Sequence, residues 1–132
     1  MKRISFLLLS LVITSVSVAS ETLQKQDFIG DWLQELNQYN RSEIILEIKT
    51  DFSGHVTRKY KPNSLQECSF KGEDTIVVDD ILIVNCHRTE SGRFKFVLGG
   101  WKTSGSSKLF GKMYMYDETH MYNGVSVSFD GN

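Results

Sequence analysis

Residues 43–61 read EIILEIKTDFSGHVTRKYK, and this stretch decides the fold. In its first part every second residue is a large aliphatic one: Ile44, Leu46 and Ile48. Alternation with a period of two is typical of a β-strand that buries one face. Asp51–Gly54 then predicts a turn, with Gly54 free to adopt a positive φ. The segment His55–Lys61 returns as a second strand, so the stretch predicts an antiparallel pair.

The same pattern continues to the end of the chain and predicts six more strands. Asp79-Asp80 is expected to form a tight hairpin turn between two of them, and Gly99-Gly100 to end another strand in a bend or bulge. The expected strands are Glu67–Lys71, Thr75–Asp79, Ile81–Arg88, Arg93–Gly99, Lys108–Tyr116 and Val125–Phe129.

A ninth element is expected at Phe28–Leu36, where the spacing of Trp32, Leu33 and Leu36 fits a strand or a short helix equally well. Eight or nine short strands joined by short turns favour an all-β antiparallel meander. Such a meander hides its edges best by closing on itself. We therefore predict a small barrel or half-barrel, whose interior is filled by side chains or holds one small ligand.

The N-terminal segment predicts export from a bacterial cell. Lys2 and Arg3 precede an apolar run from Ile4 to Ile13, and Ser17-Val18-Ala19 offers the small residues that a signal peptidase recognises. We expect residues 1–20 to be a cleaved signal peptide and residues 21–132 to form a single domain. The expected location is the periplasm or the medium.

The charge balance argues against nucleic acid and against an anionic membrane as partners. Without Lys2 and Arg3, 13 basic residues face 16 acidic ones, which is ordinary for a soluble domain and does not favour nucleic acid. After residue 20, no apolar run reaches the roughly 20 residues that a membrane-spanning helix needs. A small apolar ligand or a protein partner fits this composition better, whereas the oligomeric state is left open.

The two cysteines, Cys68 and Cys86, are each in phase with the apolar residues of their own strands. Both side chains should therefore point into the barrel. An exported chain with two cysteines favours a disulfide over free thiols. A redox-active pair usually has C-x-x-C spacing, which these residues lack, so we predict a structural bridge.

Gly30-Asp31-Trp32 resembles the G-x-W motif that opens lipocalin-type barrels, and the turn and hairpin that follow are similar to those of small bacterial lipocalin-like domains. The resemblance implies that Gly30 and Trp32 close one end of the barrel, with the tryptophan beneath a late arginine. No arginine follows Arg93, so Lys102 or Lys112 would replace it. The chain also leaves no room for the usual C-terminal helix after Phe129.

The chain lacks the spacings that mark common catalytic and metal sites. His55, His87 and His120 form no H-x-H or H-E-x-x-H motif, and no serine lies in G-x-S-x-G. Carboxylates paired at helical spacing remain possible on Asp27, Asp31 and Glu35, but such a stripe is usually a solvated face. We therefore expect no catalytic residue, no metal and no other cofactor.

We predict a non-catalytic binding protein that holds a small apolar or amphipathic ligand in the barrel mouth. The alternative is a periplasmic inhibitor or immunity-type protein that blocks a cell-wall-active enzyme or toxin, through a loop at Ser104–Ser107 or Asp117–Asn123. Aromatic residues and methionine are enriched at binding surfaces. The candidate binding residues, beside Val125 as a further lining residue, are Phe94, Phe96, Trp101, Tyr114, Tyr116 and Tyr122.

Overall fold

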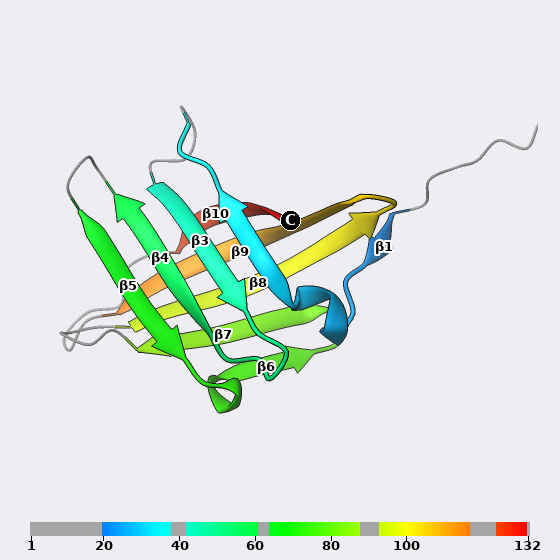
Figure 1. Cartoon of the computed structure of the whole chain (residues 1–132), viewed down its shortest axis with the longest axis horizontal. Helices are drawn as coiled ribbons and strands as arrows, with labels where there is room; N and C mark the ends of the chain where they lie inside the picture. Colours follow the sequence, from blue (N-terminus) through cyan, green and yellow to red (C-terminus); the bar gives the residue numbers. More distant parts are fainter. Residues whose placement is uncertain (1–19, 38–41, 61–63, 88–92, 117–123, 132) are drawn as a thin grey trace, which may run out of the picture.

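A computed structural model describes residues 20–37, 42–60, 64–87, 93–116 and 124–131 of the chain. They form ten strands and two short 3-10 turns (Figure 1). The strands are β1 (Glu21–Thr22), β2 (Gly30–Gln34), β3 (Ser42–Ile48), β4 (Gly54–Tyr60), β5 (Leu65–Phe70), β6 (Thr75–Val78), β7 (Ile81–His87), β8 (Arg93–Thr103), β9 (Ser106–Tyr116) and β10 (Val125–Gly131). The 3-10 turns are η1 (Lys25–Phe28) and η2 (Gly72–Asp74).

Eight of the strands close into an antiparallel barrel. Neighbours follow the order β8-β9-β10-β2-β3-β4-β5-β7, and β7 pairs again with β8 to complete the circle. The two remaining strands each pair with one barrel strand. Strand β1 pairs with the C-terminal end of β8, and β6 pairs with the first half of β7. The predicted fold class is therefore confirmed, in its closed form.

The barrel has two weak seams, and a side chain reinforces each of them. Among the described residues, Ser69 and His87 are the one pair between β5 and β7, and the Cys68–Cys86 disulfide crosses beside them. Between β10 and β2, two pairs of described residues form. There the Gln34 side chain accepts from Ser128 N (2.9 Å) and donates to Ser42 O (3.0 Å), which substitutes for backbone pairing. The predicted disulfide is thus confirmed, and it lies where backbone pairing is sparsest.

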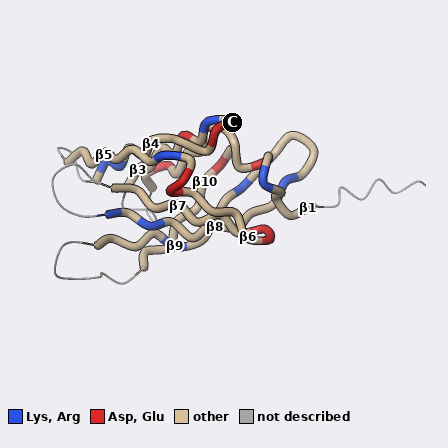
Figure 2. Tube along the Cα trace, turned by 90° about the horizontal axis from the view of Figure 1, so that it is seen from below, with Lys and Arg blue, Asp and Glu red and all other residues tan. Residues whose placement is uncertain are grey.

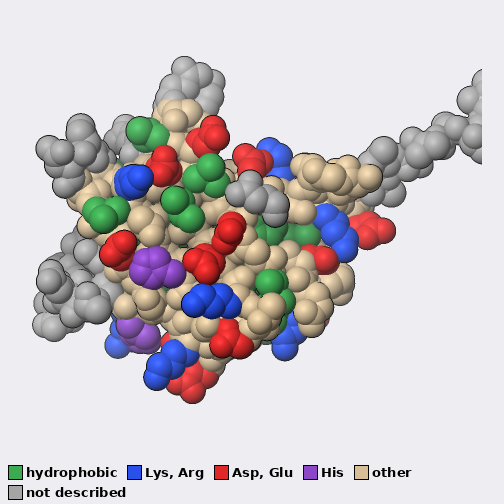
Figure 3. All heavy atoms as spheres, in the orientation of Figure 1, with side chains coloured by type: hydrophobic (Ala, Val, Ile, Leu, Met, Phe, Trp, Pro, Cys, Tyr) green, Lys and Arg blue, Asp and Glu red, His purple; other side chains and the backbone are tan. Residues whose placement is uncertain are grey.

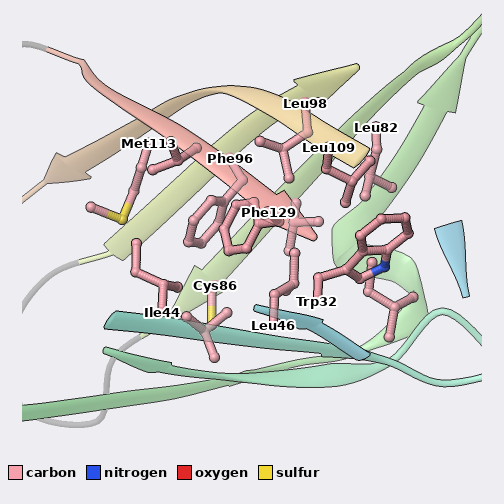
Figure 4. Packing of buried hydrophobic residues seen from close by; sticks show 14 of the residues in the cluster. Trp32, Ile44, Leu46, Leu82, Cys86, Phe96, Leu98, Leu109, Met113 and Phe129 are labelled. Atoms are coloured by element: carbon pink, nitrogen blue, oxygen red, sulfur yellow. The ribbon is translucent and has the colours of Figure 1, made fainter. Parts of the chain in front are cut away.

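The interior is filled by the inward rows of all eight strands (Figure 4). Phe96 lies at its centre, with the ring centroids of Phe94 at 6.4 Å and Phe129 at 6.3 Å. Nineteen described apolar side chains are buried in one continuous cluster, and thirteen of them have 0% of their surface exposed. Their alternation with outward polar residues is the period-two pattern from which the strands were predicted.

The N-terminal segment plugs one end of the barrel. Leu23 and Phe28 are fully buried, and the indole Nε1 of Trp32 donates to the carbonyl oxygen of Phe28 at 2.9 Å. Leu23 N also donates to Gly100 O at 3.2 Å, which ties the segment to β8. We call this the plugged end. Of the two alternatives for Phe28–Leu36, the structure has the strand, β2 from Gly30 to Gln34, whereas the 3-10 turn η1 ends before it at Phe28.

Two predictions about glycines were wrong. Gly99-Gly100 does not end a strand, because β8 runs on to Thr103; a Cβ at Gly100 would collide with Lys108 O and Leu23, so glycine admits the plug. In the β3–β4 turn the positive φ belongs to Phe52 (65°) and not to Gly54. Gly54 is required because a Cβ there would meet the Glu47 carbonyl oxygen.

An ion pair fastens the plug, and it predicts a pH dependence. Lys102 Nζ lies 2.9 Å from Asp27 Oδ1. Figure 2 marks the basic and acidic residues along the Cα trace. The backbone N–H of Gln24 and then the Lys102 ammonium lower the pKa of Asp27 from its ordinary 3.8. The Asp27 carboxylate in turn raises the pKa of Lys102 above 10.5.

A carboxyl group with a lowered pKa stabilises the fold above its unfolded pKa and loses that contribution as the pH falls through its folded pKa. Asp27→Asn should therefore lower the urea midpoint at pH 7, and the difference should close as the pH falls below the lowered pKa of Asp27, which lies under the ordinary 3.8. Asp31→Asn, on the exposed side of β2, is the control. It should leave the urea midpoint unchanged both at pH 7 and at low pH. An equal loss at both pH values would show that the pair does not account for the effect.

Among the described residues no helix is long and apolar enough to cross a membrane. The predicted signal peptide, residues 1–20, lies outside the described part of the chain except for Ser20.

Candidate functional site

A group of polar side chains lies inside the barrel at the end opposite the plug. The inward rows of β2, β3 and β4 carry Gln34, Ser42 and Arg58 here. All three side chains are buried although they are polar or charged. At this end β2 stops at Gln34, β3 begins at Ser42, and β4 stops at Tyr60. We call this the polar end, and its buried polar group is the candidate site.

Arg58 is the centre of the candidate site. Only 6% of its surface is exposed, and its Nε donates to Ser42 Oγ at 3.2 Å. Its Nη1 donates to Gln66 Oε1 at 3.0 Å and lies 3.3 Å from Met115 Sδ. The guanidinium carbon also stands 4.7 Å from the ring centroid of Tyr60. The side chain is therefore held in place from four strands.

The position of Arg58 gives the polar end a fixed positive charge. A guanidinium stays protonated at every physiological pH. Moving a charge out of water is costly, so a buried charge needs hydrogen bonds or a partner of opposite sign. A charge held in a low-dielectric interior also attracts anions more strongly than one in water. The candidate site is thus suited to an anionic or strongly hydrogen-bond-accepting group.

Sequence reasoning missed Arg58, although a signal was present. Val56 and Tyr60 share one phase of the strand predicted over His55–Lys61, and Arg58 lies between them in that phase. A long basic residue in an inward row is rare unless it is paired. That exception would have been the sign of a site.

The structure does not bring the predicted binding residues together. Phe94 and Phe96 face inward and are fully buried, whereas Tyr114 and Tyr116 stand on the outward row of β9. Trp101 pairs with Lys108, six residues from Tyr114, or about 20 Å along the strand. As binding residues these five stay predictions, and Tyr122 lies outside the described residues. Val125 is 43% exposed at the polar end, where it would border a mouth.

The outer face brings a serine, a histidine and a glutamate together. His55 Nδ1 lies 2.9 Å from Ser69 Oγ, and Nε2 lies 3.8 Å from Glu67 Oε1. His55 and Ser69 are directly opposite on β4 and β5, so this contact is an ordinary cross-strand pair. The His55 and Glu67 side chains are 38% and 55% exposed. Acyl transfer needs a water-excluded oxyanion site, which this surface position does not favour.

The other candidates from the sequence are dispersed. Asp27 lies on η1 and Asp31 on β2, so they share no helical face. Lys102 and Lys112 were the two candidates for the cation above Trp32. Lys102 pairs with Asp27, and Lys112 Nζ donates to Ser126 Oγ at 2.9 Å. The cation–π contacts found among the described residues involve the rings of Phe52 and Tyr60 and not that of Trp32. Within the described ranges, no group of three or more His, Cys, Asp and Glu could hold a metal ion.

The closed eight-stranded antiparallel barrel is consistent with a lipocalin-like fold. Comparison with family models, with curated proteins and with solved structures found no match.

Proposed function

We propose that this protein binds a small amphipathic ligand at the polar end, with the ligand's anionic group against Arg58. The observation that carries the proposal is the buried guanidinium, held by Ser42 and Gln66 at the end opposite the plug. A ligand carboxylate or phosphate would form charge-assisted hydrogen bonds with this group.

The surroundings of Arg58 supply the apolar half of the recognition. Met115 packs against the core and touches Arg58, and it is paired with Phe94 across β8 and β9. Methionine adapts easily to the shape of an apolar ligand. Because the interior beyond this level is packed as far as the plug, we expect the ligand's apolar part to stay near the polar end.

The inhibitor hypothesis has weaker support. It expected an aromatic-bearing loop at Ser104–Ser107 or Asp117–Asn123. The first is a tight turn of small residues, with Thr103 paired to Ser106 and Gly105 at φ 88°. The second lies outside the described residues. Ligand binding is therefore the function that we put forward.

A series of matched ligands tests the proposal by isothermal titration calorimetry. Decanoate, decanol and decyltrimethylammonium share one alkyl chain and differ in charge. We expect decanoate to bind roughly tenfold to hundredfold more tightly than decanol, since a hydrogen bond to a charged group contributes about 1.5–3 kcal/mol. Decyltrimethylammonium should bind most weakly.

Arg58→Met removes the charge and keeps an unbranched chain of similar length. This variant should bind decanoate and decanol equally, while its circular dichroism and disulfide match those of the wild type. Lys59→Met, on the exposed row of the same strand, is the control and should retain the preference. Saturable decanoate binding that is unchanged in Arg58→Met would contradict the assigned site, and no saturable binding of any of the three ligands would contradict the function.

A further inference from the structure

We propose that the outer face of β6–β9 binds a second copy of this chain and forms a symmetric dimer. Outward positions of a barrel in water are usually polar, but this face is apolar across four strands. Its members are Ile76 and Val78 on β6, Ile81 and Ile83 on β7, Val97 on β8 and Phe110 on β9. We call these six residues the apolar face.

The strand register makes the apolar face continuous. Ile76 is opposite Ile83, which is opposite Val97, so three aliphatic side chains form one row. In the next row Val78 is opposite Ile81, and Gly99 is opposite Phe110. A Cβ at Gly99 would lie 3.3 Å from Ile81 Cδ1, so the isoleucine side chain leans over the glycine toward Phe110.

Packing within the monomer does not explain the apolar face. Ile76, Val78 and Phe110 are 51%, 53% and 48% exposed, although the inward rows of the same strands already fill the core. Contiguous exposed apolar patches are uncommon on monomeric proteins and mark interaction sites. The stretch is also four strands wide, whereas a single exposed residue would need no explanation.

The charges that border the apolar face favour a second copy as the occupant. Asp79 and Asp80 lie at the β6–β7 turn beside Val78 and Ile81, and Figure 2 shows acidic residues at that end of β6. On the opposite side Lys112 is directly opposite Val97, and Lys95 lies on the same outward row of β8. Acidic and basic groups thus flank the apolar residues on opposite sides.

A two-fold axis makes this arrangement complementary to itself. If the axis lies in the plane of the face, across the line between the two charged groups, the acidic turn of each copy meets the lysines of the other. An isologous interface of this kind brings each contact in twice. Apolar residues at the centre with opposite charges at the rim also match the anatomy of stable interfaces. An interface of standard size needs about 20–30 residues a side, so the rim would be included.

The apolar face is separate from the proposed ligand site. Arg58 points into the barrel from β4, and the apolar face looks outward from β6–β9. A dimer formed through this face leaves the polar end outside the apolar contact.

Sedimentation equilibrium of the disulfide-intact protein tests the proposal, over a concentration series from about 1 to 100 μM. We expect a monomer–dimer equilibrium. The double variant Ile76→Thr/Phe110→Thr should weaken it by at least tenfold, because threonine suits an exposed strand and removes apolar contact area. The matched control is Ile45→Thr/Leu65→Thr, on the β2–β5 side shown in Figure 3, where exposed apolar residues are scattered among charges. It should dimerise as the wild type does.

A charge exchange separates this geometry from nonspecific association. Asp80→Lys and Lys112→Glu should each weaken the dimer, and the two together should restore it, since each copy then presents the opposite pair. A monomer at every concentration would overturn the proposal. A dimer unaffected by Ile76→Thr/Phe110→Thr, or one in which the charge variants are merely additive, would overturn the proposed face.

Discussion

Phe96→Ala is expected to lower the free energy of unfolding by about 3–5 kcal/mol, the usual cost of deleting a buried aromatic ring. Phe96 is fully buried at the centre of the barrel, between the rings of Phe94 and Phe129. A closed barrel cannot easily collapse around a missing ring, because backbone pairing fixes the distance between facing strands. Since a small domain is stable by about 5–15 kcal/mol, much of the protein should unfold at a modest urea concentration.

Urea denaturation followed by tryptophan fluorescence measures this loss. Phe96→Leu keeps most of the apolar volume and is the matched control, with an expected loss below about 1.5 kcal/mol. If Phe96→Ala cost less than about 1 kcal/mol, the interior would be loosely filled. A ligand cavity lined by Phe94 and Phe96 would then be favoured over a site at the polar end.

Replacement of both cysteines by serine is the second large effect that we expect. The bridge joins residues 18 apart, and a loop of about that length predicts a stabilisation of about 3 kcal/mol in the chain-entropy description. The position strengthens this expectation. Among the described residues the β5–β7 seam has one paired position, Ser69 with His87, so the bridge is a main link between these two strands.

Two measurements distinguish a structural bridge from a reactive one. Cys68→Ser/Cys86→Ser should lower the urea midpoint and speed amide hydrogen exchange in β5 and β7 more than in β3 and β4, whose pairing is complete. Both sulfurs are buried, with Cys68 at 3% and Cys86 at 0% exposure, so native wild-type protein should resist reduction until it opens. Rapid reduction in the absence of denaturant would contradict a purely structural role.

The strands were predictable because each depends on its own residues. The alternation of Ile44, Leu46 and Ile48 requires one buried face wherever the strand lies in the sheet. The Asp79-Asp80 hairpin turn followed from local chemistry in the same way, and Val78 is indeed opposite Ile81. By contrast, Gly100 was misjudged because its need for glycine comes from Leu23 on a distant segment.

The candidate site was not predictable to the same degree. Arg58 became significant only when Ser42, Gln66 and Met115 were found around it, from three other strands. The aromatic candidates illustrate the opposite case. Trp101 and Tyr114 are near one another in sequence, yet the long β8–β9 hairpin separates them along its length.

By itself, then, the sequence determined the all-β class, most strands and the inward direction of both cysteines, because period-two alternation is a local property. The tertiary structure alone decided how the barrel closes. Pairing of β10 with β2, the Gln34 bridge at the same seam and the plug of Leu23 and Phe28 against β8 all join segments far apart in the chain. Such contacts depend on shear and register around the whole circle, which no single stretch of residues encodes.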